Sequence, residues 1–142
     1  MTVVLDANLL VVLALDDERA PLVEAKMREW AGAGATLHAP ALMPYEAANA
    51  LVRAAVADGL SPDVVAEIWA MIAAMPVILH PLAEGVAVIA IARRLGRHSA
   101  YDAAYVALAQ SLNAQLWTLD GPLARNARGI GLPVRLLGSA DD

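Results

Sequence analysis

The stretch TVVLDANLLVVLAL, residues 2–15, decides the predicted fold. Its first part, residues 2–6, is apolar and β-branched, as expected of a buried strand that ends at Asp6, and the run from about Asn8 to Leu15 predicts a helix. An ionised carboxylate is costly to remove from water unless it is paired, hydrogen-bonded or bound to a metal. We therefore expect Asp6 either to reach a cleft or to meet a cation.

Strand-like and helical segments alternate along the rest of the chain. Strands are predicted at 36–40, 77–80, 115–120 and 134–137, and helices at 20–34, 45–59, 61–75, 84–96, 99–113 and 121–129. This alternation is typical of an α/β fold in which helices cover a mostly parallel sheet. The sequence has no repeat, no low-complexity segment and no Gly/Ser-rich linker, so we expect residues 1–142 to form a single domain.

The composition excludes several classes of protein. Apolar residues make up 59% of the chain, but Asp16 or Pro76 interrupts the longest apolar runs well short of the ~18 residues that indicate a membrane span. A signal peptide has a basic region before its first apolar run, and this sequence has none there, so we do not expect a signal peptide. The absence of cysteine excludes disulfides and thiolate metal sites and fits a cytoplasmic protein. A net charge of −5 argues against broad, nonspecific coating of nucleic acids but is compatible with a local basic patch.

Four acidic residues are predicted to share one edge of the sheet. Asp6 and Asp120 end predicted strands, whereas Glu46 and Asp102 lie in the first turns of predicted helices. In open parallel α/β sheets, sites form at the carboxyl ends of the strands, where the following helices begin. The sequence therefore predicts that these side chains meet.

Helix capping is the structural alternative for each of these acids. Carboxylates are favoured near helix N-termini in general. Ser99 and Asp102 fit the S-x-x-D capping pattern, and Asp120 has the position of an N-cap for the next helix. Capping explains Asp6 less well, because an N-cap residue does not need to be preceded by such an apolar strand. It also does not predict that all four acids fall on one edge.

Four converging carboxylates need a cation. Two like charges 4 Å apart cost about 4 kcal/mol at an effective dielectric constant of 20. Mg²⁺ and Mn²⁺ prefer oxygen ligands and phosphate substrates, and a cluster without Cys or His partners favours them over zinc. Such cations activate water and stabilise the in-line displacement of a phosphodiester. The residues thus predict a hydrolytic Mg²⁺ site, with Mn²⁺ as a substitute.

Four stretches in order resemble the motifs of the PIN-domain nucleases, most closely the VapC-type ribonuclease toxins of toxin–antitoxin pairs. VVLDANLLV resembles their first motif, PYEAANAL the helix of the second, and SAYDAAYVALAQ the third. LWTLDGPLARNA matches the fourth, T-x-D-x-x-L-x-x-x-A. The resemblance covers roughly residues 2–137. Each motif alone is weak, and the ordered set is specific.

The resemblance implies a three-layer α/β/α fold and endonucleolytic cleavage of RNA that depends on Mg²⁺ or Mn²⁺. It also implies a homodimer and a small antitoxin partner. The residues that correspond to the family's catalytic, metal-binding acids are Asp6, Glu46, Asp102 and Asp120. Gly121 follows Asp120 where charged residues are frequent in the family, so the motif lacks an adjacent extra acid and the number of metal ions stays open.

Several polar residues near these motifs have two interpretations. Asn8 and Thr118 correspond to supporting polar residues of the family site, although Asn8 is equally explained as a helix cap and Thr118 as an ordinary strand residue. Arg53, Arg97 and His98 are candidates for RNA contacts. Arg53 is equally explained as a solvated helix residue, and the other two as partners of a helix C-terminus.

The tyrosines beside Asp102 also have two interpretations. Tyr101 and Tyr105 have rings that can stack on a base, but packing in the core or at a dimer interface explains them better.

Four rival functions are weighed against the nuclease. A PIN fold without catalysis, binding RNA or a protein partner, is the main alternative. A phospho-receiver domain needs a lysine on a late strand, and the one lysine, Lys26, lies in an early helix. A D-x-D phosphatase fails at Asn8, and no G-x-S-x-G stretch is present for a triad hydrolase.

Overall fold

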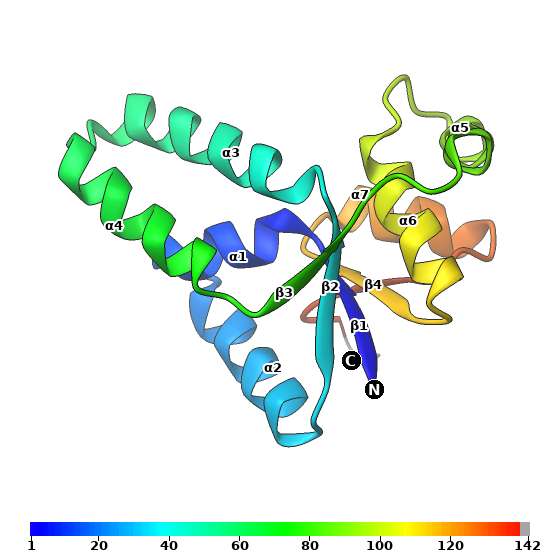
Figure 1. The fold of residues 1–142 in the computed structure, drawn as a ribbon, viewed down its shortest axis with the longest axis horizontal. Helices are drawn as coiled ribbons and strands as arrows, with labels where there is room; N and C mark the ends of the chain where they lie inside the picture. The colour runs from blue at the N-terminus through cyan, green and yellow to red at the C-terminus, as the bar shows by residue number, and fades with distance from the viewer. Residues whose placement is uncertain (140–142) are drawn as a thin grey trace.

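A computed structural model describes residues 1–139 of the chain. Its centre is a sheet of five strands in the order β3-β2-β1-β4-β5, and every neighbouring pair is parallel. The strands are β1 (Thr2–Leu5), β2 (Thr36–Pro40), β3 (Val77–His80), β4 (Gln115–Thr118) and β5 (Val134–Leu136). The predicted parallel α/β sheet is therefore confirmed (Figure 1).

Helices form a layer on each side of the sheet. They are α1 (Ala7–Ala14), α2 (Ala20–Gly32), α3 (Met43–Asp58), α4 (Pro62–Ala73), α5 (Gly85–Arg94), α6 (Tyr101–Ser111) and α7 (Gly121–Gly129). In Figure 1, α1–α4 lie to the left of the sheet and α5–α7 to the right. Helix α6 packs on β1, β2 and β4, and α1 packs against α2, α3 and α4. The layers match the predicted α/β/α architecture.

The first strand is buried because both layers cover it. Val3, Val4 and Leu5 have at most 1% of their surface exposed. Trp30 and Trp117 meet edge to face, with ring centroids 5.7 Å apart, and the ammonium group of Lys26 lies 4.2 Å from the centroid of the Trp117 ring. The one lysine of the chain is thus held against a core tryptophan.

No helix among residues 1–139 is long and apolar enough to span a membrane.

The two strands that lead to Asp6 and Asp120 end earlier than predicted. β1 ends at Leu5 and β4 at Thr118, so Asp6 and Asp120 do not end strands but occupy the N-cap positions of α1 and α7. The difference arises because each strand passes directly into a helix, and the acid belongs to the turn between them. The acids still lie at the carboxyl edge of the sheet.

The predicted capping pattern of α6 is wrong. Helix α6 begins at Tyr101, and its N-cap position is Ala100, which makes no side-chain capping bond. The hydroxyl of Ser99 instead accepts a 3.3 Å hydrogen bond from the backbone N–H of Tyr101. Since this local turn occupies Ser99 one residue before the cap, the carboxylate of Asp102 remains available for other contacts.

Candidate functional site

Asp6 lies in the turn between β1 and α1, and its carboxylate does not cap the helix. Its Oδ2 atom accepts a 2.8 Å hydrogen bond from the hydroxyl of Thr118. Burial raises the pKa of Asp6 from its ordinary value of 3.8 to about 7, and the negative charges of Glu46 and Asp102 add to this effect. The hydrogen bond from Thr118 and the nearby backbone N–H of Asn8 oppose it. Asp6 is therefore a buried acid whose ionisation needs a compensating positive charge.

Thr118 is the hub of the hydrogen bonds around Asp6. Besides donating to Asp6, its fully buried hydroxyl accepts from the backbone N–H of Asp120 at 3.0 Å and from Nδ2 of Asn8 at 3.3 Å. One donor and two acceptor positions are the full capacity of a hydroxyl. Thr118 therefore links three segments of the site and is more than an ordinary strand residue.

Asn8 points into the site and does not cap α1, so the capping interpretation is wrong. It lies inside α1, and its side-chain amide donates to Thr118. Because the hydroxyl hydrogen of Thr118 goes to Asp6, the amide must present its nitrogen to Thr118. Its Oδ1 atom is buried and has no hydrogen-bond partner within residues 1–139. A buried carbonyl oxygen without a partner favours an additional ligand at this point.

Glu46 is held by a tyrosine from α6. The hydroxyl of Tyr105 donates a 2.6 Å hydrogen bond to Oε1 of Glu46. Burial and the charge of Asp102 raise the pKa of Glu46, and the bond from Tyr105 opposes this. Burial, followed by the bond to Glu46, also raises the pKa of the Tyr105 hydroxyl above its ordinary value of 10.0. Tyr105 therefore remains a neutral donor.

The sequence interpretation placed Tyr105 in the core and missed its hydroxyl contact. The residue is buried, as expected. The available signal was its spacing, because Tyr105 lies three positions after Asp102 and so shares a face of the helix with it.

Asp102 and Asp120 complete the acidic group. Burial raises the pKa of Asp102, the guanidinium of Arg97 lowers it, and the charge of Asp120 raises it. Oδ1 of Asp120 accepts a 3.0 Å hydrogen bond from the backbone N–H of Leu123. The capping interpretation of Asp120 is therefore confirmed, and it accounts for one of the two carboxylate oxygens.

The acids are linked through their charges, as expected for side chains at one sheet edge. Glu46 and Asp102 raise the pKa of Asp6, Asp102 raises that of Glu46, and Asp120 raises that of Asp102. Nevertheless, within residues 1–139 no set of three or more His, Cys, Asp or Glu side chains is arranged closely enough to hold a metal ion. Thr118, Tyr105 and the N-terminus of α7 each bind one oxygen of a different carboxylate. The acidic group therefore offers only oxygen ligands.

Of the three basic candidates, only Arg97 contacts an acid of the site. Its Nε atom lies 3.8 Å from Oδ2 of Asp102. Arg53, on α3, and His98, between α5 and α6, are exposed, and neither has a hydrogen bond or ion pair with another residue of the described chain. Their contact with RNA stays a prediction.

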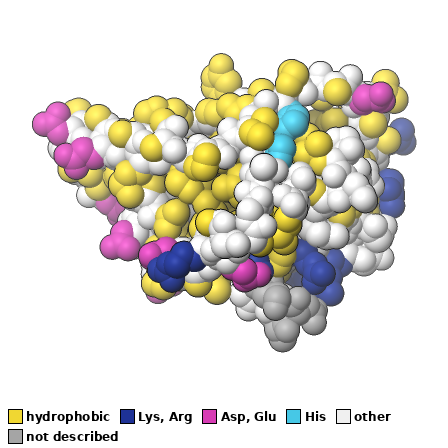
Figure 2. Space-filling model, turned by 60° about the horizontal axis from the view of Figure 1, so that its bottom comes forward, with side chains coloured by type: hydrophobic (Ala, Val, Ile, Leu, Met, Phe, Trp, Pro, Cys, Tyr) yellow, Lys and Arg dark blue, Asp and Glu magenta, His cyan; other side chains and the backbone are white. Residues whose placement is uncertain are grey.

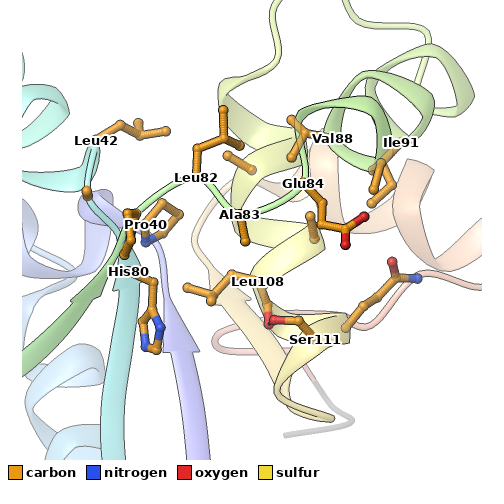
Figure 3. A pocket seen from close by; sticks show the side chains of 16 residues that line it. Pro40, Leu42, His80, Leu82, Ala83, Glu84, Val88, Ile91, Leu108 and Ser111 are labelled. Atoms are coloured by element: carbon orange, nitrogen blue, oxygen red, sulfur yellow. Dashed lines mark hydrogen bonds between the residues drawn. The ribbon is translucent and has the colours of Figure 1, made fainter.

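A cavity of about 550 Å³ lies away from the acids, between α5, α6 and the ends of β2 and β3 (Figure 3). Its walls are mainly apolar and include Leu82, Val88 and Leu108, and none of the four acids lines it. Leu108 and Ser111 of α6 point into this cavity, whereas Tyr105 of the same helix reaches Glu46. Helix α6 therefore separates an apolar hollow from the acidic site.

Comparison with known proteins agrees with the fold. Residues 3–129 match the family described as PIN domain. Ribonuclease VapC3 from Pyrobaculum aerophilum is 33% identical to this chain over 138 residues, which cover 94% of this chain and 100% of that protein.

Two solved structures have a similar fold. VapBC2 from Rickettsia felis, bound to a DNA fragment from its promoter, contains a chain that matches with a TM-score of 0.68 at 12% identity, covering 96% of this chain and 98% of that one. VapC20 from Mycobacterium tuberculosis, a sarcin-ricin loop cleaving toxin, matches with a TM-score of 0.62 at 17% identity, covering 92% and 95%. At these identities the likeness shows the fold alone. Because the family match covers most of the chain and is supported by a full-length relative, the chain belongs to the PIN domain family.

Proposed function

We propose that this protein is a metal-dependent endoribonuclease that hydrolyses phosphodiester bonds in RNA. The observation that carries the proposal is Asp6, a buried carboxyl with a pKa near 7 that lies among electrostatically coupled acids. Perturbed acids that lie together at a sheet edge are typical of catalytic sites. Asp6, Glu46, Asp102 and Asp120 are the residues that we assign to catalysis and to the metal.

The donor group fits a hard divalent cation. All four acids supply oxygen, and the unpartnered Oδ1 atom of Asn8 is a further neutral oxygen at the same place. Mg²⁺ and Mn²⁺ prefer such ligands and keep several waters, which reduces the number of protein ligands that each requires. When bound, such a cation supplies an activated water and offsets the charge of the scissile phosphate.

The protein's own contribution is to orient the acids. Thr118 fixes Oδ2 of Asp6, Tyr105 fixes Oε1 of Glu46, and the N-terminus of α7 fixes Oδ1 of Asp120. Each of these carboxylates therefore has one oxygen held by the protein and a second oxygen that can turn toward a cation. Oriented ligands of this kind lower the cost of assembling the site when the metal and substrate arrive.

We also propose that the protein is the toxin of a toxin–antitoxin pair, acting in the cytoplasm as a homodimer with a small antitoxin as its partner. Its full-length relative is named a ribonuclease of the VapC type, and a structural neighbour comes from a VapBC complex. Large apolar side chains such as Val56 and Val86 are more than 80% exposed, and exposed apolar surface of this kind is available for protein contacts. Co-purification with the product of a neighbouring reading frame and light scattering test these assignments.

The nuclease is tested with purified protein and a mixture of structured RNAs. We expect cleavage with Mg²⁺ or Mn²⁺ that leaves 5′-phosphate and 3′-hydroxyl ends, no cleavage in EDTA, and none by Asp6→Asn, which retains the fold. Cleavage by Asp6→Asn at the wild-type rate would overturn the assignment. RNA binding without cleavage under any metal condition would instead support the catalytically idle PIN module.

A further inference from the structure

Charge is divided unequally between the two parts of the chain. Residues 1–84 contain four Lys or Arg against eleven Asp or Glu, whereas residues 85–139 contain six Arg against two acids. Those two acids are Asp102 and Asp120, which belong to the site. Apart from the two site acids, residues 85–139 therefore carry only positive formal charge, and Glu84 lies just before them, at the N-cap of α5.

The division is also visible on the surface. Figure 2 shows most of the visible acidic side chains toward the left, the side on which α3 and α4 lie in Figure 1, although one lies at the upper right. Most of the visible Lys and Arg side chains lie toward the right, the side of α5–α7. The α3–α4 end carries Asp58, Asp63 and Glu67, all exposed. A polyanion is repelled from that end and attracted to the other.

Arg125 brings one of these charges to the acidic site. A Cβ atom placed on Gly121 would meet Nη1 of Arg125 at 2.9 Å, so the guanidinium folds back over the start of α7 into the space that a side chain would fill. Gly121 directly follows Asp120. Arg125 is exposed and has no hydrogen bond or ion pair with any residue between 1 and 139. Its position depends on the absence of a side chain at Gly121.

A second arginine approaches the site from another element. Arg97, just after α5, lies 3.8 Å from Asp102. The end of α5 is joined to α7 by two hydrogen bonds, from Arg94 to the carbonyl of Ile130 at 2.9 Å and from the amide of Asn126 to the carbonyl of Leu95 at 2.8 Å. The two helices therefore present their basic side chains as one connected surface.

We propose that the RNA strand enters across this surface, formed by the end of α5 and by α7, with Arg125 and Arg97 binding the phosphates next to the bond that is cut. The inference rests on the proposed nuclease function, because it identifies how the substrate reaches that site. Guanidinium groups bind phosphate through paired, charge-assisted hydrogen bonds. They also offset the repulsion that the acids exert on RNA. The proposed RNA path does not cross the acidic α3–α4 end, so Arg53, which lies on α3, does not contact the RNA along it.

The test measures RNA binding in an Asp6→Asn background, so that the bound RNA stays intact. The probe is a fluorescent RNA hairpin with an unpaired loop, titrated at several KCl concentrations and fixed Mg²⁺. Loss of one phosphate contact lowers the slope of log K against log salt by about 0.7–1. We expect Arg125→Ala to show this loss and weaken binding severalfold, and Arg125→Glu to weaken it further.

The matched controls are Arg53→Ala and Arg28→Ala. Arg53 lies on the α3 route, and Arg28 is exposed on α2, where it pairs with Glu24. We expect both to bind as the parent does. Unchanged binding by the Arg125 variants, or a loss with Arg53→Ala as large as that with Arg125→Ala, would overturn the proposal.

A second pair of variants tests the position of the guanidinium while keeping the arginine. Gly121→Ala must displace Arg125, whereas Gly129→Ala, at the other end of α7, meets no atom within 4 Å. We expect weaker RNA binding for Gly121→Ala alone, and equal binding by the two would overturn the folded-back position. If the protein with Asp6 intact does not cleave RNA, the proposed function fails, but these binding measurements still decide the surface.

Discussion

Thr118 and Asp6 are 112 positions apart in the sequence and are joined by a 2.8 Å hydrogen bond at the carboxyl edge of the sheet, between the neighbouring strands β1 and β4. The bond exists because β1 and β4 are parallel neighbours, with Leu5 beside Trp117 in the register. Each strand delivers its next polar residue to the same edge. The site is therefore assembled by strand pairing, and a change in this pair affects both stability and chemistry.

Thr118→Val tests directly what the hydrogen bonds of the Thr118 hydroxyl contribute. Valine has a similar shape but leaves the N–H of Asp120 and the carboxylate of Asp6 without their partner, and each buried unsatisfied group costs about 1–3 kcal/mol. We expect the free energy of unfolding to fall by about 2–4 kcal/mol. Thr118→Ser keeps the hydroxyl and loses one buried methyl group, which costs about 1 kcal/mol. Urea denaturation compares the two, and equal losses would show that the hydroxyl contributes nothing.

Asp6 makes the stability of the metal-free protein depend on pH. Its pKa is raised on folding, from 3.8 to about 7, so the folded state binds the proton more tightly than the unfolded state. The resulting stabilisation is fully present below about pH 4 and is lost as the pH rises through 7, and at 1.36 kcal/mol per pKa unit it amounts to about 4 kcal/mol.

Asp6→Asn removes this titration. In EDTA, we expect the free energy of unfolding of the variant to change less between pH 5 and pH 8 than that of the wild type, and to exceed it at pH 8. Added Mn²⁺ is expected to stabilise the wild type at pH 8 and to have little effect on the variant, because a ligand stabilises only a state that binds it. Parallel pH profiles of the two proteins would contradict the burial of this charge.

Tyr105→Phe removes the donor that holds Glu46 and leaves the ring in the core. Loss of such an orienting hydrogen bond typically costs 10–100-fold in metal affinity or activity, as an order of magnitude. We expect a loss of about this size in Mn²⁺ affinity, measured by calorimetry, and in RNA cleavage. The control is Tyr45→Phe, which is adjacent to Glu46 but 80% exposed. If both variants behave as the wild type does, Glu46 needs no orientation by Tyr105.

The position of the acids at the carboxyl edge of the sheet could be predicted from the sequence, because the patterns that indicate it are local. Asp6 follows an apolar strand, and Asp120 precedes a helix that has a proline in its first turn. The sequence pattern alone therefore places both acids at a strand-to-helix turn. The predicted ends of the two strands differ because neither acid has a register partner on a neighbouring strand, although the backbone N–H of Asp6 still donates a 3.0 Å hydrogen bond to the carbonyl of Trp117. In the same way Ser99 fitted a capping pattern, but a shorter local turn competes for its hydroxyl.

The contacts made by Tyr105 and Arg125 could not be predicted in this way. A tyrosine in an Ala- and Leu-rich helix fits core packing equally well, and only the packing of α6 brings its hydroxyl to Glu46, 59 positions away in the sequence. An exposed arginine in a short helix has no pattern of its own. Its placement follows from the missing side chain of Gly121, which becomes informative only once the backbone is known.

Asp120 allows capping and catalysis to be separated in one residue. Its Oδ1 atom caps α7 by accepting from Leu123 at 3.0 Å, and asparagine caps helices as well as aspartate does. We expect Asp120→Asn to keep the free energy of unfolding within a few tenths of a kcal/mol, and Asp120→Ala to lose about 1 kcal/mol.

RNA cleavage distinguishes the two roles of Asp120. If the carboxylate serves the metal, both variants lose most of their cleavage although only Asp120→Ala is destabilised. If Asp120 serves α7 alone, cleavage follows stability, and Asp120→Asn remains as active as the wild type. Urea denaturation and cleavage at saturating Mn²⁺, measured on the same preparations, decide between these outcomes. A helix cap requires only an oxygen acceptor, whereas a neutral amide binds a divalent cation more weakly than a carboxylate does.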